Sequence, residues 1–306
     1  MKKTLLADSS LLFVAFIWGT TFVLVQNAIR VLEPMSFNAT RFFLAGMILL
    51  LWLLLFYRPQ LKQINKKMLA AGFLMGLWLF SGYALQTFGL LYTTSSKAGF
   101  ITGLSVVLVP LFAFFLLKQR PKPNSILGVL VATAGLYMLT LGDSVSVNKG
   151  DILVFFCAIA FALHIIFTGK YTTLFPTLLL TVTQILTVAI LCSIFAFIFE
   201  DWNAVFSKDV LLSNEVIIAL LITSIFATAL AFLLQTNFQK YTTPTRVALI
   251  FAMEPVFAAL GGYYLADERL TVIAISGCLF IFVGMVFAEL PGRKKKSLQP
   301  SEHISY

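Results

Sequence analysis

Charged residues are scarce in this chain of 306 residues. Lys, Arg, Asp and Glu together make up 11% of it, whereas a soluble domain carries about 25%, and 59% of the residues are hydrophobic with a mean hydropathy of +0.94. This composition excludes an ordinary soluble domain. It indicates an integral membrane protein whose main partner is the lipid bilayer.

Cysteine and histidine are also rare, with three and two residues. Cys157, Cys192 and Cys278 lie in apolar segments, so we interpret them as small hydrophobic residues and not as a disulfide framework. His164 is the only histidine in an apolar run, and one histidine cannot form a metal cluster. Neither a nucleophile–base set nor a Gly-rich Lys-Ser/Thr nucleotide motif is visible. The sequence therefore predicts no catalytic residues, no metal, no cofactor and no enzyme.

Acidic residues are outnumbered by basic ones, and the formal net charge is +9. The basic residues lie in short loops between apolar runs, which is a topology signal and does not indicate a nucleic-acid partner. If the N-terminus is cytoplasmic, the inner segments hold most Lys and Arg, from Lys2 to the run Arg293–Lys296. The outer segments then hold only Arg30, Lys97, Lys149, Lys208 and Arg269. We expect a multi-pass protein of the bacterial cytoplasmic membrane with both termini in the cytoplasm.

Apolar runs dominate what remains, and ten of them approach the length of a membrane span, which is about 20 residues. They predict an all-α integral membrane protein with ten transmembrane helices. The first run follows Lys2 and Lys3 without a small-residue cleavage site, so we expect an uncleaved first span. The predicted spans are Ser9–Ala28, Ser36–Phe56, Met68–Phe88, Lys97–Leu117, Asn124–Leu141, Asp151–Thr168, Thr177–Phe199, Asn214–Leu234, Thr243–Leu265 and Leu270–Glu289.

Short motifs recur at one fixed offset of 149 residues (235 minus 86) without a gap. Leu85–Thr87 returns as Leu234–Thr236, Tyr92–Thr94 as Tyr241–Thr243, and Gly128 and Gly135 as Gly277 and Gly284. A fixed offset predicts a duplication, and five crossings per copy insert the second copy upside down. We therefore expect two inverted five-helix repeats, an arrangement typical of secondary transporters. The expected division is a first repeat at 1–142, a connecting loop at 143–150, a second repeat at 151–290 and a basic cytoplasmic tail at 291–306.

An ordered set of motifs resembles the EamA family of the drug/metabolite transporter superfamily, from about Leu11 to Ala288. The set comprises Trp18–Phe22, Arg41–Phe42, Gln86 before Tyr92–Thr94, Glu254–Phe257, Glu268–Arg269 and the segment from Gly277 to Gly284. The first half departs from the family pattern at Lys118–Arg120, where members often carry a Gly-Glu-Arg-like turn. We therefore expect no chemistry at this turn.

This resemblance implies two inverted five-helix halves around a central cavity that takes a small-molecule substrate. The implied function is secondary transport of small metabolites across the cytoplasmic membrane, as an exporter of amino acids or related compounds. An importer or exchanger and a lipophilic-drug efflux permease are the alternatives. A membrane-embedded enzyme or a receptor has the least support, because the spans show no catalytic set and the loops are short. The oligomeric state is left open, a monomer included.

Polar and aromatic side chains recur at helical spacing within several spans, which places them on single helix faces. Longer polar side chains such as Gln86, Gln235 and His164 are hard to satisfy between packed helices, so we expect them in the cavity wall. For the Ser and Thr positions, close helix packing is the competing interpretation. The predicted substrate-binding residues are Trp18, Thr21, Trp78, Gln86, Thr102, His164, Thr228 and Gln235.

Two charged residues, Arg41 and Glu254, lie more than one helical turn inside predicted spans, where ionised groups are costly. Arg41 suits either a substrate carboxylate or a structural partner. Glu254 lies near the middle of the ninth span and precedes Pro255, so we expect the helix to bend there. Its carboxyl group suits either a structural hydrogen bond or proton coupling, and both roles remain open for Glu254 and Arg41.

The predicted topology is tested with reporter fusions. A reporter placed after Lys296 should report the cytoplasm, and one inserted within residues 201–208 should report the exterior, because ten spans return the chain to its starting side. A C-terminal reporter that reads the exterior would contradict the scheme of five plus five spans.

Overall fold

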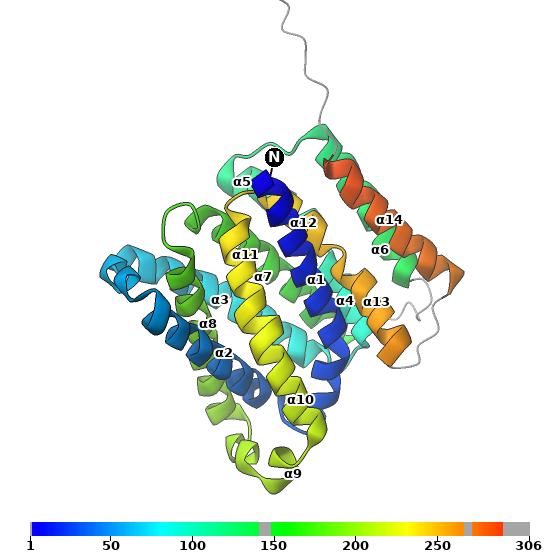
Figure 1. Cartoon of the computed structure of the whole chain (residues 1–306). Coiled ribbons are helices and arrows are strands. Elements are labelled where there is room, and N and C mark those ends of the chain that lie inside the picture. Colours follow the sequence, from blue (N-terminus) through cyan, green and yellow to red (C-terminus); the bar gives the residue numbers. More distant parts are fainter. Residues whose placement is uncertain (1, 141–147, 266–270, 290–306) are drawn as a thin grey trace, which may run out of the picture.

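The protein is a bundle of helices in the computed structural model, which describes residues 2–140, 148–265 and 271–289 (Figure 1). No strand occurs in these ranges, so the predicted all-α class is confirmed for them. Most of the predicted connecting loop (143–147), the turn that holds Arg269, and the tail at 291–306 lie outside the described residues.

The described helices are packed side by side, mostly in long runs joined by short turns. They are α1 (Lys2–Ala28), α2 (Pro34–Phe56), η1 (Arg58–Gln63), α3 (Lys66–Gly89), α4 (Ser95–Gly103), α5 (Ser105–Leu117), α6 (Pro123–Thr140), α7 (Lys149–Tyr171), α8 (Thr177–Phe199), η2 (Trp202–Phe206), α9 (Lys208–Leu211), α10 (Asn214–Ile222), η3 (Thr223–Leu230), α11 (Ala231–Gln239), α12 (Pro244–Phe251), α13 (Glu254–Leu265) and α14 (Val272–Glu289).

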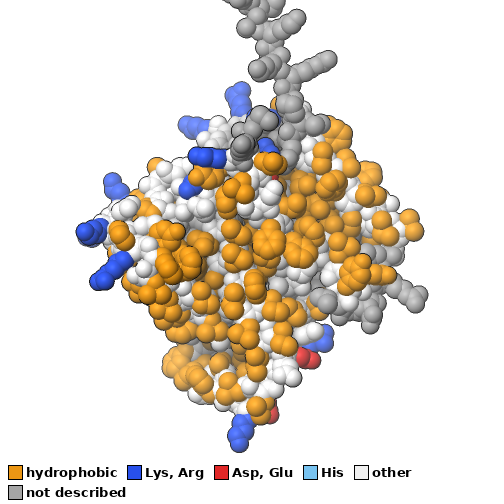
Figure 2. All heavy atoms as spheres, viewed as in Figure 1, with side chains coloured by type: hydrophobic (Ala, Val, Ile, Leu, Met, Phe, Trp, Pro, Cys, Tyr) orange, Lys and Arg blue, Asp and Glu red, His pale blue; other side chains and the backbone are white. Residues whose placement is uncertain are grey.

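Among the described residues, eight helical runs are long and apolar enough to cross a membrane, and shorter apolar helices occur at Pro123–Met138 and Val272–Phe287. Large apolar side chains stay exposed, as Leu55 (73%) and Phe199 (71%) illustrate. Figure 2 shows hydrophobic side chains over most of one face, with Lys and Arg near its edges. These are the features of a multi-pass membrane protein. The count of ten spans and the inverted repeat stay predictions.

Two of the predicted spans are interrupted near their middles. The fourth is divided into α4 and α5 at Leu104, and the ninth into α12 and α13 at Ala252 and Met253. Pro255 explains the second break, because it cannot donate to the Phe251 carbonyl and its ring clashes there. The first break follows Gly103, which is unfavourable inside a helix. The two breaks occur at the same offset of 149 residues (253 minus 104).

The eighth predicted span is not a regular α-helix either. It runs from Asn214 to Gln239, beyond the predicted Leu234, and its middle part, η3, is a π-helix. The wider turn changes the direction of nearby carbonyl groups and is frequent at functional sites. In η3 the Ala227 carbonyl accepts bonds from Trp18 Nε1 (2.8 Å) and from an Arg41 guanidinium N–H (3.4 Å). Side chains of α1 and α2 thus satisfy this carbonyl group of the irregular turn.

Helices α6 and α14 lie side by side and pack through glycines (Figure 1). A Cβ added at Gly135 would lie 2.6 Å from the Gly277 carbonyl oxygen, and one added at Gly284 would lie 2.6 Å from the Gly128 carbonyl oxygen. Along α6, residues 128 to 135 therefore face residues 284 to 277 of α14 in decreasing order, so the two helices are antiparallel. Backbone contact this close tolerates no side chain.

A larger residue at either close contact should destabilise the fold. Replacing Gly135 or Gly284 by Val should cost about 1–3 kcal/mol through overpacking, because the atoms that the side chain meets are backbone and cannot turn away. The measurement is thermal unfolding of the purified protein in detergent. Gly99→Ala is the control, since its Cβ would meet only atoms 4.0 Å away. Equal unfolding temperatures for all three variants would contradict the packing described.

Candidate functional site

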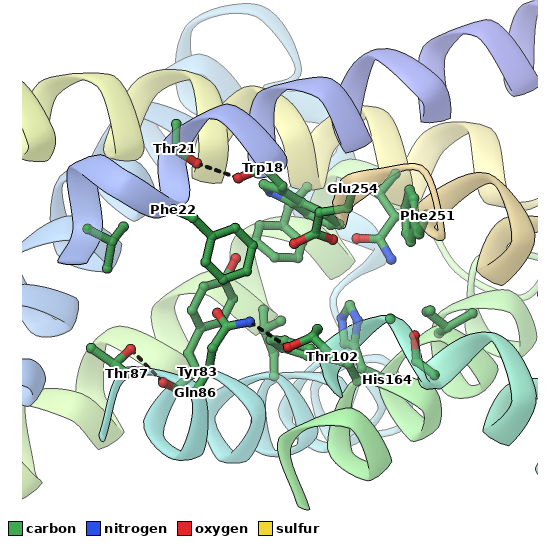
Figure 3. Close-up of a pocket in the computed structure, with 18 of the residues that line it drawn as sticks. Trp18, Thr21, Phe22, Tyr83, Gln86, Thr87, Thr102, His164, Phe251 and Glu254 are labelled. Carbon is green, nitrogen blue, oxygen red and sulfur yellow. Dashed lines mark hydrogen bonds between the residues drawn. The ribbon is translucent and has the colours of Figure 1, made fainter. Parts of the chain in front are cut away.

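A cavity lies between the helices. Its empty space, with the open solvent at its mouth included, is about 790 Å³. Its walls come from α1, α2, α3, α7, α11 and the two interrupted runs, and both breaks border it. Figure 3 shows Trp18 and Glu254 on one side of the space and Gln86, Thr102 and His164 across it. Six aromatic residues line it: Trp18, Phe22, Tyr83, Phe161, Phe232 and Phe251.

Most of the residues that the sequence predicted for the site meet in this cavity. Those that line it are Trp18, Thr21, Arg41, Gln86, Thr102, His164, Gln235 and Glu254. The structure thus brings together residues that are up to 236 positions apart (254 minus 18). Trp78 and Thr228 are not among the lining residues.

Trp78 lies two turns before Gln86 on α3 and packs against α7. Its ring stacks on Phe167 with 6.5 Å between centroids. Each step of four residues overshoots a full helical turn, so two steps rotate the side chain by about 80°. That rotation separates Trp78 from the face that carries Gln86. The spacing rule fails here because it was extended over too many turns.

Thr228 contacts the site only through another side chain. Its Oγ1 accepts a 2.7 Å bond from Arg41 Nε, and it is fully buried. The Arg41 guanidinium also lies over the Tyr83 ring, 4.9 Å from the centroid, where a cation–π contact is favourable. Arg41 itself is 3% exposed. Thr228 and Tyr83 therefore hold a buried cation at the cavity wall.

Glu254 is the first residue of α13 and lies at the break between α12 and α13. Its side chain points into the space opposite Thr102 and His164 (Figure 3). Within the described part of the chain, no hydrogen-bond donor reaches its carboxylate. Its place in the first turn of α13 is favourable for an acidic group, because the helix dipole is positive there. The predicted bend at Pro255 is confirmed by the end of α12 at Phe251.

His164 heads a chain of hydrogen bonds that leads away from the cavity. Its Nε2 is 2.9 Å from Gln184 Oε1, and Gln184 Nε2 donates to Thr236 Oγ1 at 3.0 Å. Thr168 Oγ1 lies 3.3 Å from the same imidazole nitrogen. The chain joins α7, α8 and α11, so neighbouring side chains set the orientation of His164.

Gln86 and Gln235, which the repeat relates, have different partners. Gln86 Nε2 donates to Thr102 Oγ1 at 3.2 Å, whereas Gln235 Nε2 donates to Gln239 Oε1 at 3.4 Å. Gln235 Oε1 is buried without a partner in the described residues. The Gln86 amide is therefore bonded to Thr102 in the cavity wall, whereas the Gln235 side-chain oxygen can still accept a hydrogen bond.

Sequence reasoning missed several lining residues, among them Tyr83, and it favoured helix packing over the cavity wall for Ser105. Ser105 is the position that the offset of 149 relates to Glu254, so the repeat itself was a signal that could have found it. Ser105 and Glu254 each begin the second part of an interrupted run. Tyr83 is one turn before Thr87 on α3, and no polar spacing pointed to it.

Comparison with known proteins shows one family over nearly the whole chain. The sequence model of the EamA-like transporter family matches residues 5–141 and again residues 148–289. The resemblance expected from the sequence motifs is thereby confirmed.

Relatives and a solved structure agree with this match. An uncharacterized transporter of Archaeoglobus fulgidus is 37% identical over 289 residues, which cover 94% of this chain and 87% of the relative. The uncharacterized transporter YoaV of Bacillus subtilis is 22% identical, with 89% and 92% covered. A crystal structure with 18% sequence identity superposes with a TM-score of 0.74 over 94% of this chain and 99% of that chain, which shows a shared fold.

The bond from Trp18 to η3 should stabilise the fold. In Trp18→Phe the Ala227 carbonyl keeps only the longer 3.4 Å contact from Arg41, so the loss of its shorter hydrogen bond should cost about 0.5–1.5 kcal/mol. Thermal unfolding in detergent should show the loss. Trp52→Phe is the matched control, because Trp52 is 46% exposed. A Trp18→Phe unfolding temperature no lower than that of the control would contradict this role.

Proposed function

Because the chain belongs to the EamA-like transporter family, we propose that it is a secondary transporter of small metabolites and that it exports amino acids or related compounds. Family and relatives point to a transporter rather than an enzyme. The multi-pass helical fold accords with that role.

The observation that carries the proposal is the composition of the cavity wall. It combines one cationic side chain, Arg41, and one carboxylate, Glu254, with aromatic rings and amide groups. An amino acid has groups that match each of these: its carboxylate suits Arg41, its ammonium suits Glu254, and its side chain suits the rings. Pockets with mostly apolar walls and a few polar groups are typical of small-ligand sites. In this proposal Trp18, Thr21, Gln86, Thr102, His164 and Gln235 complete the contact surface.

The setting that we propose is the bacterial cytoplasmic membrane, with ten spans as two inverted five-helix halves and both termini in the cytoplasm. The antiparallel contact between α6 and α14 supports the inverted arrangement. So do the two interruptions at one offset. In transporters built this way, the substrate site lies between the halves at interrupted helices, which is where this cavity lies.

A lipophilic-drug efflux permease is the second candidate. The observation that favours it is the set of aromatic walls around a carboxylate that accepts no hydrogen bond within the described residues. A lipophilic cation would use the same two features, because aromatic faces attract cations. It would have no use for Arg41.

The proposed function is tested by comparing extracellular metabolites of cells that express the protein with those of cells that do not. One amino acid or a few related compounds should accumulate outside the expressing cells. The double variant Gln86→Leu/Gln235→Leu is the control for a protein that inserts but no longer binds. Depletion of external metabolites would replace export by import. Unchanged metabolites together with resistance to lipophilic cations would favour the drug permease.

Glu254→Gln separates the two roles of this carboxyl group. The amide keeps the shape and the hydrogen-bonding capacity but cannot ionise. If Glu254 couples transport to protons, the variant should insert normally and lose at least tenfold in transport driven by a pH gradient, while exchange of substrate across vesicles continues. Gradient-driven transport at the parent rate would leave Glu254 with a structural role.

A further inference from the structure

Two ion pairs lie outside the cavity and join helices that are distant in sequence. Asp8 on α1 pairs with Arg246 on α12, with 2.5 Å between Oδ2 and the guanidinium nitrogen. Lys97 on α4 pairs with Asp151 on α7, with 2.6 Å between Nζ and Oδ2. None of the four residues lines the cavity. The transport site therefore does not account for either pair.

The basic residues of the two ion pairs occupy equivalent places in the two halves. Lys97 and Arg246 are separated by the same offset of 149 residues (246 minus 97). Each lies in the first turn of the first part of an interrupted run, where Thr94 or Thr243 caps the helix by accepting a bond from its backbone N–H. Each acidic partner lies near the start of a long helix of the opposite half. Both pairs thus cross from one half to the other.

The pairs lie at opposite ends of the bundle. Asp8 is near the beginning of α1, which spans 27 residues, or about 40 Å. The other pair is near the end of α1, because Ala98 and Val154, neighbours of Lys97 and Asp151, pack in the same apolar cluster as Ala28. The cavity residues of α1, Trp18 and Thr21, lie between. One pair is therefore found at each end of the pathway that the cavity implies.

Each pair is well made and partly sheltered. Arg246 binds both carboxylate oxygens of Asp8, with Nε at 3.0 Å from Oδ1. At the other end, Asp151 also accepts bonds from Thr93 Oγ1 (2.8 Å) and from the Asn148 backbone N–H (2.9 Å). The acidic side chains are only 11% and 6% exposed. Geometry of this kind, and not the bare presence of charges, makes an ion pair count toward stability.

We propose that the two ion pairs are reciprocal gates, one closing each end of the pathway against the other half. Lys97–Asp151 holds α4 to α7 at the end where α1 terminates, and Asp8–Arg246 holds α12 to α1 where α1 begins. When the halves rock apart at one end, the pair at that end separates while the other stays formed. The inference rests on the proposed transport function, since gates imply a pathway that opens alternately.

Breaking one pair should bias the protein toward the state that is open at that end, because an interaction present in only one of two states shifts their populations. Lys97→Met and Arg246→Met are matched variants at equivalent positions that keep an unbranched side chain and remove its charge. Lys149→Met is the control, because Lys149 is an exposed cation two residues from Asp151. Within the described residues it forms no ion pair.

The test uses a membrane-impermeant thiol reagent and needs no substrate. The reporter is Ser105→Cys, a small change in the cavity wall, in a background where the three native cysteines are replaced by Ala. Labelling is followed in membrane vesicles of both orientations. Lys97→Met should speed labelling about fivefold or more from the side where α1 ends. Arg246→Met should do so from the side where α1 begins.

The proposal is overturned if Lys97→Met and Arg246→Met both speed labelling from the same side of the membrane. It is also overturned if their labelling rates equal that of Lys149→Met. The charge-swapped protein Asp8→Arg/Arg246→Asp guards against misfolding as the cause, because it restores a pair and should return to the parent rates. Swapped rates as high as those of Arg246→Met would also refute the gate. A failure to find a transported metabolite would leave these results intact, so the two proposals fail separately.

Discussion

The arrangement of this protein depends on where its backbone can leave regular helical hydrogen bonding. In hydrocarbon no water is available to the freed N–H and C=O groups, so irregular backbone is tolerated only against protein or along a water-filled space. The breaks at Leu104 and at Ala252–Met253 border the cavity, and the π-helical turn has its Ala227 carbonyl bonded by Trp18 and Arg41. The cavity is found where the interrupted helices meet.

Electrostatics within the bundle follow from the same scarcity of water. Arg41 is held by the Thr228 hydroxyl, a backbone carbonyl and the Tyr83 ring, so its charge has fixed partners. Glu254 has the dipole of α13 and an open side toward the cavity. The partners of Arg41 are neutral and hold its charge in a fixed place at the wall, whereas the carboxylate of Glu254 faces open space, where a ligand or a proton can reach it. The two charged residues of the cavity are thus suited to different tasks.

The sequence was sufficient for the helical class, for the family and for eight of the twenty residues that line the cavity. Gln86, His164 and Gln235 were predictable because a long polar side chain in an apolar run has few other places to go. Trp78 lies off the cavity face because two steps of four residues rotate it by about 80° from Gln86. Thr228 contacts the cavity wall only through its hydrogen bond with Arg41. The break after Gly103 lacked the proline that made the break before Glu254 visible. The pairs Asp8–Arg246 and Lys97–Asp151 needed three-dimensional packing, because each joins helices that no local pattern connects.

The glycine contact between α6 and α14 also bears on how such a fold could arise. Gly135 of α6 contacts Gly277 of α14, and Gly284 of α14 contacts Gly128 of α6. The two helices therefore pack through equivalent surfaces. A surface of this kind is complementary to itself when one copy is turned over. One helix with this surface would pack antiparallel against a copy of itself, so a duplicated helix of this kind would have needed no new contact there.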